Sequence, residues 1–145
     1  MTLTDNNPEL DVEDFVITYL VGQAILPAAQ ISGRMPPKLN TPFILVQRVA
    51  GGDDYIVDSA TISVHSFANA QTDASTIART VHHAMRQLHP KTVLTVDGNP
   101  WNIYRFTTEQ TPIFADWEPS GGGTVMSRYV ARYRIDVRLP SIRGY

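Results

Sequence analysis

Histidine is the residue type most often used to bind metal ions or to transfer protons, and it occurs at four positions: His65, His82, His83 and His89. His82 and His83 are adjacent, so on a helix their side chains diverge by about 100° and are poorly placed to share one ion. His82 and His89 lie two helical turns apart. Neither pair has the four-residue spacing of the zinc signature H-E-x-x-H. We therefore expect neither a metal site nor a bound cofactor.

Nucleophilic catalysis has equally little support. The chain has no G-x-S-x-G nucleophile elbow, and Ser120 precedes three glycines in a predicted loop rather than in a strand-to-helix turn. A hydrolase that uses His65 or His83 is accordingly the weakest alternative, and we expect a protein without catalytic residues.

Two glycine clusters and one aspartate cluster could suggest phosphate or calcium binding. Gly51-Gly52 and Gly121–Gly123 do not open a helix and carry no Lys-Ser/Thr pair, so they do not form a phosphate-binding loop. Asp53, Asp54 and Asp58 lack the alternating ligand positions and the terminal glutamate of an EF-hand. We interpret the aspartates as a charged, solvated turn.

The last predicted strand, Met126–Leu139, has the strongest pattern in the chain. Four arginines that share one face repel one another unless solvent, acids or phosphates compensate them. A solvated sheet face is one interpretation, and a nucleic-acid surface is another, since arginine contacts phosphates. No aromatic residue shares that face, however, so the stacking platform of a single-strand binder is missing. Along the strand, Tyr129, Ala131, Tyr133, Ile135, Val137 and Leu139 alternate with Arg128, Val130, Arg132, Arg134, Asp136 and Arg138.

A third partner for the arginines is an acidic surface of the same protein. The chain has 145 residues and a net charge of −2, but residues 1–60 hold eight acids against three bases, and residues 61–145 hold nine bases against six acids. In a ring of identical subunits, the arginine face of one copy can meet the acidic hairpin of the next, which is a heterologous, closing contact. The candidate subunit-interface residues are Arg128, Arg132, Arg134, Arg138, Asp53, Asp54 and Asp58.

Composition excludes several classes of protein. There is no cysteine, which excludes disulfides and thiolate chemistry. No run of 18 apolar residues is present, so we expect no membrane partner, and the N-terminus lacks the features of a signal peptide. We expect one domain over residues 1–145, made in the cytosol, with flexible ends at 1–10 and 140–145.

Two helices are predicted. The first is capped by Asp11 and ends near Gly22–Pro27, and the second is capped by Thr72 or Asp73 and ends near Leu88, before His89-Pro90. The segment Ala28–Thr41, which carries Arg34 and Lys38, is expected to be an irregular loop.

The strands are predicted to form an antiparallel or mixed sheet. A hairpin joins two of them through a turn at Ala50–Asp54, and a flexible glycine tip at 119–123 precedes the last one. The order α-β-β-α-β-β-β-β indicates a single α+β domain with both helices on one face of the sheet. The predicted strands are Phe43–Val49, Ile56–Phe67, Thr92–Val96, Ile103–Thr108, Phe114–Trp117 and Met126–Leu139.

The last strand is long for its domain. Fourteen residues extend about 46 Å, whereas a domain of this size is about 38 Å wide. The strand must therefore bend, break at a bulge near Val130–Arg132, or project onto a neighbour.

Several segments, in their order and spacing over about residues 10–140, resemble tail terminator proteins of siphophages that infect actinobacteria. They are FILVQRVAGGDD (43–54), ATISVHSFA (60–68), ARTVH (78–82), PIFADW (112–117) and RYVARYR (128–134).

The resemblance implies a ring, typically a hexamer, at the head-proximal end of the virion tail. Such a ring stops polymerisation of the major tail tube protein and joins the tail to head-completion or connector proteins, while double-stranded DNA passes through the lumen unread. Another head–tail connector or neck protein is the alternative within this class. The candidate loop residues that would contact the tube or connector are Arg34, Lys38, Gly121, Gly122 and Gly123.

Overall fold

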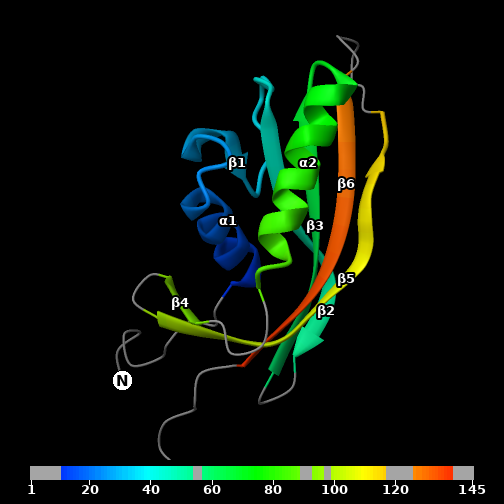
Figure 1. Ribbon diagram of the computed structural model, residues 1–145. Helices are drawn as coiled ribbons and strands as arrows, with labels where there is room; N and C mark the ends of the chain where they lie inside the picture. Colours follow the sequence, from blue (N-terminus) through cyan, green and yellow to red (C-terminus); the bar gives the residue numbers. More distant parts are fainter. Residues whose placement is uncertain (1–10, 54–56, 89–92, 97–98, 117–125, 139–145) are drawn as a thin grey trace, which may run out of the picture.

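The computed structural model describes residues 11–53, 57–88, 93–96, 99–116 and 126–138 (Figure 1). The ends at 1–10 and 140–145, and the candidate residues Asp54, Gly121, Gly122 and Gly123, lie outside this part of the chain. One domain of α+β class is observed, as predicted. No helix among the described residues is long and apolar enough to cross a lipid bilayer.

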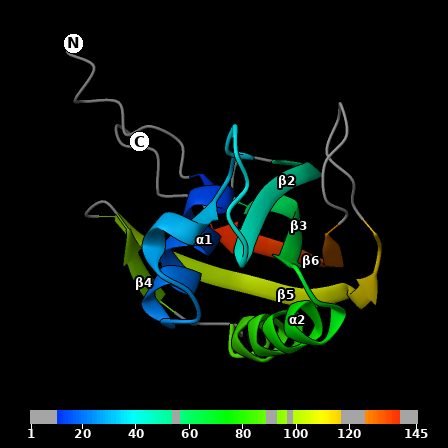
Figure 2. The same cartoon turned by 90° about the horizontal axis from the view of Figure 1, so that it is seen from above.

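A six-stranded mixed sheet forms the body of the molecule, with strand order β1-β2-β3-β6-β5-β4. The short β1 pairs parallel with β2, and all other pairs are antiparallel. Figure 1 shows both helices against the same face, and Figure 2 shows β5 running beside α2 towards β4. The elements are α1 (Val12–Gly22), β1 (Ile31–Ser32), β2 (Phe43–Asp53), β3 (Val57–Ala68), α2 (Gln71–Met85), β4 (Val93–Val96), β5 (Asn99–Phe114) and β6 (Ser127–Arg138).

Helix α1 begins as predicted. The side chain of Asp11 accepts a hydrogen bond from the Glu13 amide at 3.0 Å, which satisfies one of the free N–H groups of the first turn. The Tyr19 hydroxyl donates to the Ala84 carbonyl at 2.7 Å and so joins α1 to α2. The expected loop at 28–41 contains a 3-10 turn at Ala28–Gln30 and then β1.

Helix α2 begins earlier than predicted, because its N-cap position lies two residues before Thr72 and three before Asp73. Ala70 occupies the N-cap position without a side-chain hydrogen bond, so the predicted capping by Thr72 or Asp73 is wrong. Only two residues separate the end of β3 at Ala68 from the helix, and this short connection sets where the helix can start. Asp73 instead lies in the first turn, where its negative charge favours the helix dipole.

The hairpin of β2 and β3 is confirmed, but β2 extends through the predicted turn to Asp53. A bulge interrupts the pairing between Arg48 and Ala50, and Gly51 adopts φ +112°. Only glycine fits there easily, because a Cβ at Gly51 would collide with the backbone carbonyl of Ser59.

Strand β5 is continuous, whereas two strands broken at Glu109–Pro112 were predicted. Within the described chain, β4 pairs only with Asn99–Asn102, so the outer edge of β5 beyond that point has no strand partner. Pro112 therefore removes no hydrogen bond on that edge, and it lies at a register shift between Gln110 and Ile113.

Strand β6 bends instead of projecting straight (Figure 1). Its pairing with β3 has no register shift from Ser127 to Arg138. The bulges lie in the neighbouring strand β5, at three places, and each adds a residue to β5 so that it follows the longer path along the curve. The predicted overshoot is thus resolved by bending.

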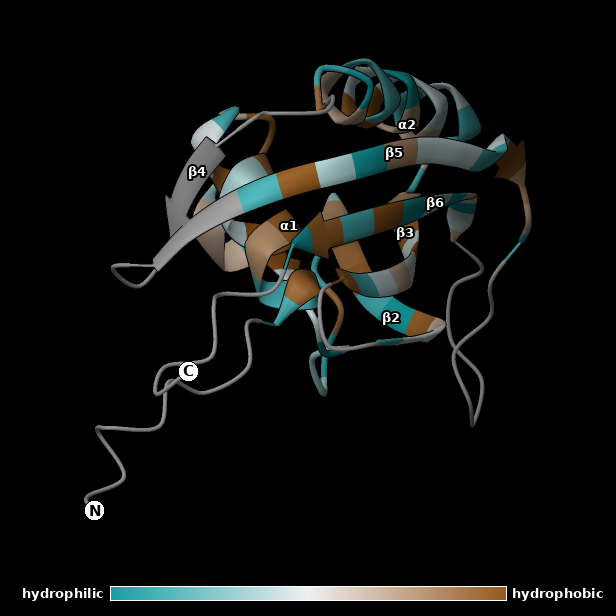
Figure 3. Ribbon diagram, turned by 90° about the horizontal axis from the view of Figure 1, so that it is seen from below, coloured by the Kyte–Doolittle hydropathy of each residue, from teal (hydrophilic) through white to brown (hydrophobic). Residues whose placement is uncertain are grey.

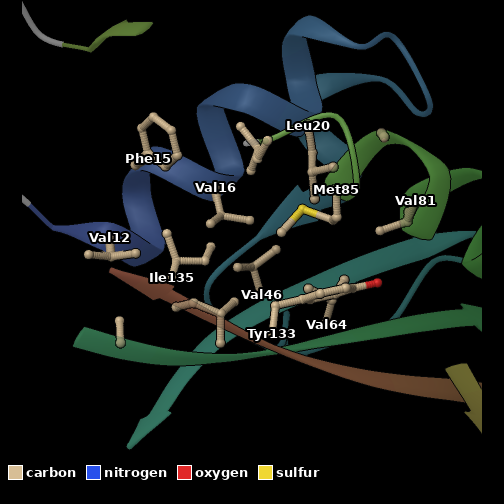
Figure 4. Close-up of a cluster of buried hydrophobic side chains, with 14 of the residues drawn as sticks. Val12, Phe15, Val16, Leu20, Val46, Val64, Val81, Met85, Tyr133 and Ile135 are labelled. Carbon is tan, nitrogen blue, oxygen red and sulfur yellow. The ribbon is translucent and has the colours of Figure 1, made fainter. Parts of the chain in front are cut away.

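The main core lies between the helices and the sheet (Figure 4). Tyr133 is fully buried there, its ring packs on Phe106, and its hydroxyl hydrogen-bonds His82 Nδ1 at 2.8 Å. A second, smaller cluster of Phe43, Leu45 and Phe67 lies on the opposite face of the sheet, where Met35 and Leu39 cover it.

Candidate interaction face

The arginines of β6 lie on the sheet face turned away from the helices, which we call the open face. Cross-strand partners share a face, and β3 and β5 supply small hydroxyl side chains beside the arginines. Alternate residues of β6 enter the core, as the alternation of hydropathy in Figure 3 reflects. The register pairs are Arg128–Phe67, Arg132–Ser63, Arg134–Thr61, Arg138–Val57 and, from β5, Thr107–Arg134 and Arg105–Asp136.

Positive charge on the open face is largely uncompensated. Among its register-paired residues Asp136 is the only acid, and it is buried and bound at 3.3 Å by Nε of Arg134. Arg132 and Arg138 are exposed, and no ion pair of either is seen within the described residues. Arg128 is half-buried and donates from Nε to the Ala115 carbonyl at 3.2 Å.

A serine–histidine pair lies among these arginines. Ser63 is 2% exposed, and its Oγ lies 2.9 Å from Nε2 of His65. Burial, followed by the charges of Arg128 and Arg132, lowers the pKa of His65 to about 4, so the imidazole is neutral at pH 7. Its Nδ1 is buried and has no hydrogen-bond partner.

The pair does not form a catalytic triad within the described residues, because no carboxylate binds Nδ1 of His65 and orients the ring. His83, the other histidine considered for hydrolysis, is exposed on α2. No group of three or more metal-ligating side chains gathers in the described parts of the chain.

Acidic residues gather on the helix side of the sheet. Asp58 pairs with Val137 in register and is therefore on the core face, where it is 6% exposed. Both of its carboxylate oxygens accept hydrogen bonds from Arg48, at 2.7 and 2.8 Å. Both oxygens of Asp58 are thus bound by Arg48 of the same chain, so Asp58 is not a candidate for the subunit interface.

Several exposed acids lie on this side, and we call two of them, Asp11 and Asp53, the acidic patch. The hydrogen bonds to Asp58 are the main cause of the raised pKa of Arg48. Burial opposes this rise, and the charges of Asp58, Asp11 and Asp53 add to it. Both acids of the patch therefore act on Arg48 electrostatically. Because Asp53 pairs with Asp58 in register, the patch and the arginines lie on opposite sides of one sheet.

The two ends of the strands also differ. One end exposes Ile113 and Phe114, 50% and 41% exposed, with the ring of Phe114 against Tyr129. The other end carries Asp53 and Arg138, both exposed. The first end, which we call the apolar end, therefore exposes large apolar side chains near Asp116, and the second, the charged end, exposes an acid and a base.

The candidate loop residues Arg34 and Lys38 are exposed in the segment between β1 and β2. Met35 and Leu39 of the same segment pack on the smaller cluster, which places the segment at the β2 border of the open face.

A scan against models of known protein families finds no match to this chain, and a search of curated protein sequences finds none either.

Proposed function

We propose that this chain is a subunit of a ring that caps the completed tail tube of a siphophage. The ring, a hexamer of identical copies, stops the addition of tube protein and offers a docking surface to the head-completion protein. It occupies the head-proximal end of the tail, and DNA passes through its centre as cargo. Another head–tail connector of the neck is the alternative within the same class.

The observation that carries this proposal is the placement of opposite charges on the two sides of one sheet. The arginines lie on the open face and the acidic patch lies on the helix side. A surface and its complement on opposite sides of a molecule join copies head to tail, and such contacts close into a ring when the rotation between copies is suitable.

Two further features support the proposal. A cap needs one surface for the tube and another for the connector, and the apolar and charged ends of the strands are unlike enough to meet different partners. The segments that resemble tail terminators also include the hairpin β2–β3 and the arginine strand β6, the elements on which the two charged surfaces lie.

The proposal is tested in phage particles that lack this chain. We expect tails of irregular and excessive length without attached heads, seen by electron microscopy, and restoration when the chain is supplied. Tails of normal length joined to heads would exclude the proposed role.

A second function, nucleic-acid binding, is favoured by the uncompensated arginines of the open face. Each phosphate contact that releases a counterion steepens the salt dependence of affinity. Duplex DNA binding that weakens steeply with salt and is lost in Arg132→Ala/Arg134→Ala would favour this function, and the absence of binding at low salt would exclude it.

A further inference from the structure

The open face contains a local arrangement that a merely solvated sheet face does not require. His65 is opposite Val130 in register, so its ring lies between the positions of Arg128 and Arg132 on the neighbouring strand. Burial is the main cause of the lowered pKa of the imidazole, and the charges of Arg128 and Arg132 lower it further, so both guanidinium groups act on the ring electrostatically. Two cationic side chains thus flank the position of the imidazole along β6.

Polar atoms at this place are left without partners. Nδ1 of His65 is buried from solvent and unbonded, and native proteins rarely leave such atoms unpaired without a functional reason. Arg132 is exposed and has no carboxylate partner in the described chain. The nearest acid on the face in register, Asp136, already binds Arg134.

An oxyanion is the chemical group that satisfies this arrangement. Guanidinium groups bind carboxylates and phosphates through paired, charge-assisted hydrogen bonds. A bound negative charge would also offset the field of the two arginines at His65, which is the smaller of the two causes that lower its pKa.

We propose that Arg128 and Arg132, beside the Ser63–His65 pair, bind the carboxylate of Asp53 from a second copy of this chain. The inference rests on the ring proposed above and names the contact that joins its subunits. We call this place the carboxylate site.

The distribution of charged residues favours a second copy over a nucleic acid as the source of the oxyanion. Asp53 is exposed at the end of β2, beside Gly52, which has open space around its Cα. It lies on the helix side of the sheet, whereas the carboxylate site lies on the open face, so Asp53 cannot reach the site of its own chain and the proposed contact is head to tail. The two aromatic residues on the open face of β2 and β3, Phe43 and Phe67, are buried and do not offer a stacking surface for bases.

Sedimentation equilibrium of the full chain tests the site. Arg132→Gln is the chosen change because the side chain is exposed, whereas Arg128 also holds the Ala115 carbonyl and could disturb the fold. We expect the dissociation constant for self-association to rise about tenfold, a change of about 1.4 kcal/mol. Asp53→Asn should have a similar effect. Arg79→Gln, which removes the same charge from the exposed side of α2, should leave the constant unchanged.

Charge exchange separates this contact from a general effect of charge. Arg132→Glu and Asp53→Arg should each abolish association, and the chain that carries both changes should regain it. Nuclear magnetic resonance signals of the His65 ring should shift on association in the wild-type chain and not in Arg132→Gln.

Several results would overturn the inference: a wild-type chain that stays monomeric at every concentration, an unaltered constant in Arg132→Gln, or no rescue by the exchanged pair. Binding of a short DNA duplex that shifts the His65 signals would also overturn it, in favour of phosphate.

These outcomes are distinct from failure of the proposed function. If the site is confirmed but particles lacking the chain have normal tails, only the function is wrong; if Arg132→Gln assembles normally and tails still depend on the chain, only the site is wrong.

Discussion

The ion pair between Arg48 and Asp58 gives a stability prediction that can be worked out from its geometry. Two charge-assisted hydrogen bonds of 2.7 and 2.8 Å join the side chains, which are 28% and 8% exposed. Exposed ion pairs contribute about 0–1 kcal/mol, whereas breaking a buried pair by removing one partner costs about 3–5 kcal/mol. The half-buried pair lies between these limits, so we expect Asp58→Asn to lower the free energy of unfolding by about 2.5 kcal/mol.

Thermal and urea unfolding measure this change. The unfolding entropy of a 145-residue domain is about 0.3 kcal/mol/K, so the predicted loss corresponds to a fall in Tm of about 8 °C. The measurement is made at a concentration where the chain is monomeric, because self-association would add its own stabilisation.

Arg134→Gln is the matched control. This side chain makes a single contact of 3.3 Å and is 49% exposed, but the Asp136 side chain that it binds is only 6% exposed, so we expect a cost of about 1–2 kcal/mol, smaller than that of Asp58→Asn. Equal and small effects of the two substitutions would refute the reasoning, because they would mean that burial and paired geometry give Arg48–Asp58 no advantage. Such a result would also return Asp58 to the set of acids available to a neighbour.

Two other predictions concern the hairpin and the pH dependence of stability. Gly51→Ala should destabilise the chain by about 2 kcal/mol or more, since φ is +112° and the new Cβ meets the Ser59 carbonyl, whereas Gly52→Ala, with open space, should be nearly neutral in urea unfolding; equal effects would contradict the assigned backbone. The pKa of His65 falls to about 4 on folding from 6.5, so its contribution is complete above pH 6.5 and is lost as the pH falls towards 4. After discounting for the partial exposure of the ring, we expect this loss to be about 1–2 kcal/mol. It is measured as the difference between wild-type and His65→Gln urea unfolding at the two pH values, and parallel pH profiles would contradict it.

The sequence predicted those parts of the fold that depend on local patterns. The alternation along β6 identified its buried and exposed faces, because side chains of a strand point to opposite sides in turn. The Asp11 cap followed from residue type and position. The errors arose where tertiary context decides: Pro112 is tolerated because the adjoining strand edge is unpaired, and Ala70 caps α2 because β3 ends two residues earlier.

The arginine row of the open face could be read from the sequence, but its surroundings could not. Ser63 and His65 face Arg132 and Val130 only through the register of β3 with β6, which pairs residues almost seventy positions apart. Asp58 looked like one more acid of an exposed turn, although Arg48 holds it inside the fold. The two-residue spacing of Ser63 and His65 within a strand was the one local signal, since it places both side chains on the same face.

The central claim, that copies of this chain close into a ring that ends the tail tube, is tested most directly by polymerising the tail tube protein of the same phage with and without the chain. Negative-stain electron microscopy should show shorter tubes, each closed at one end by a ring, and Arg132→Glu should abolish both effects while Arg79→Gln preserves them. Tubes of unchanged length without rings at their ends would contradict the claim.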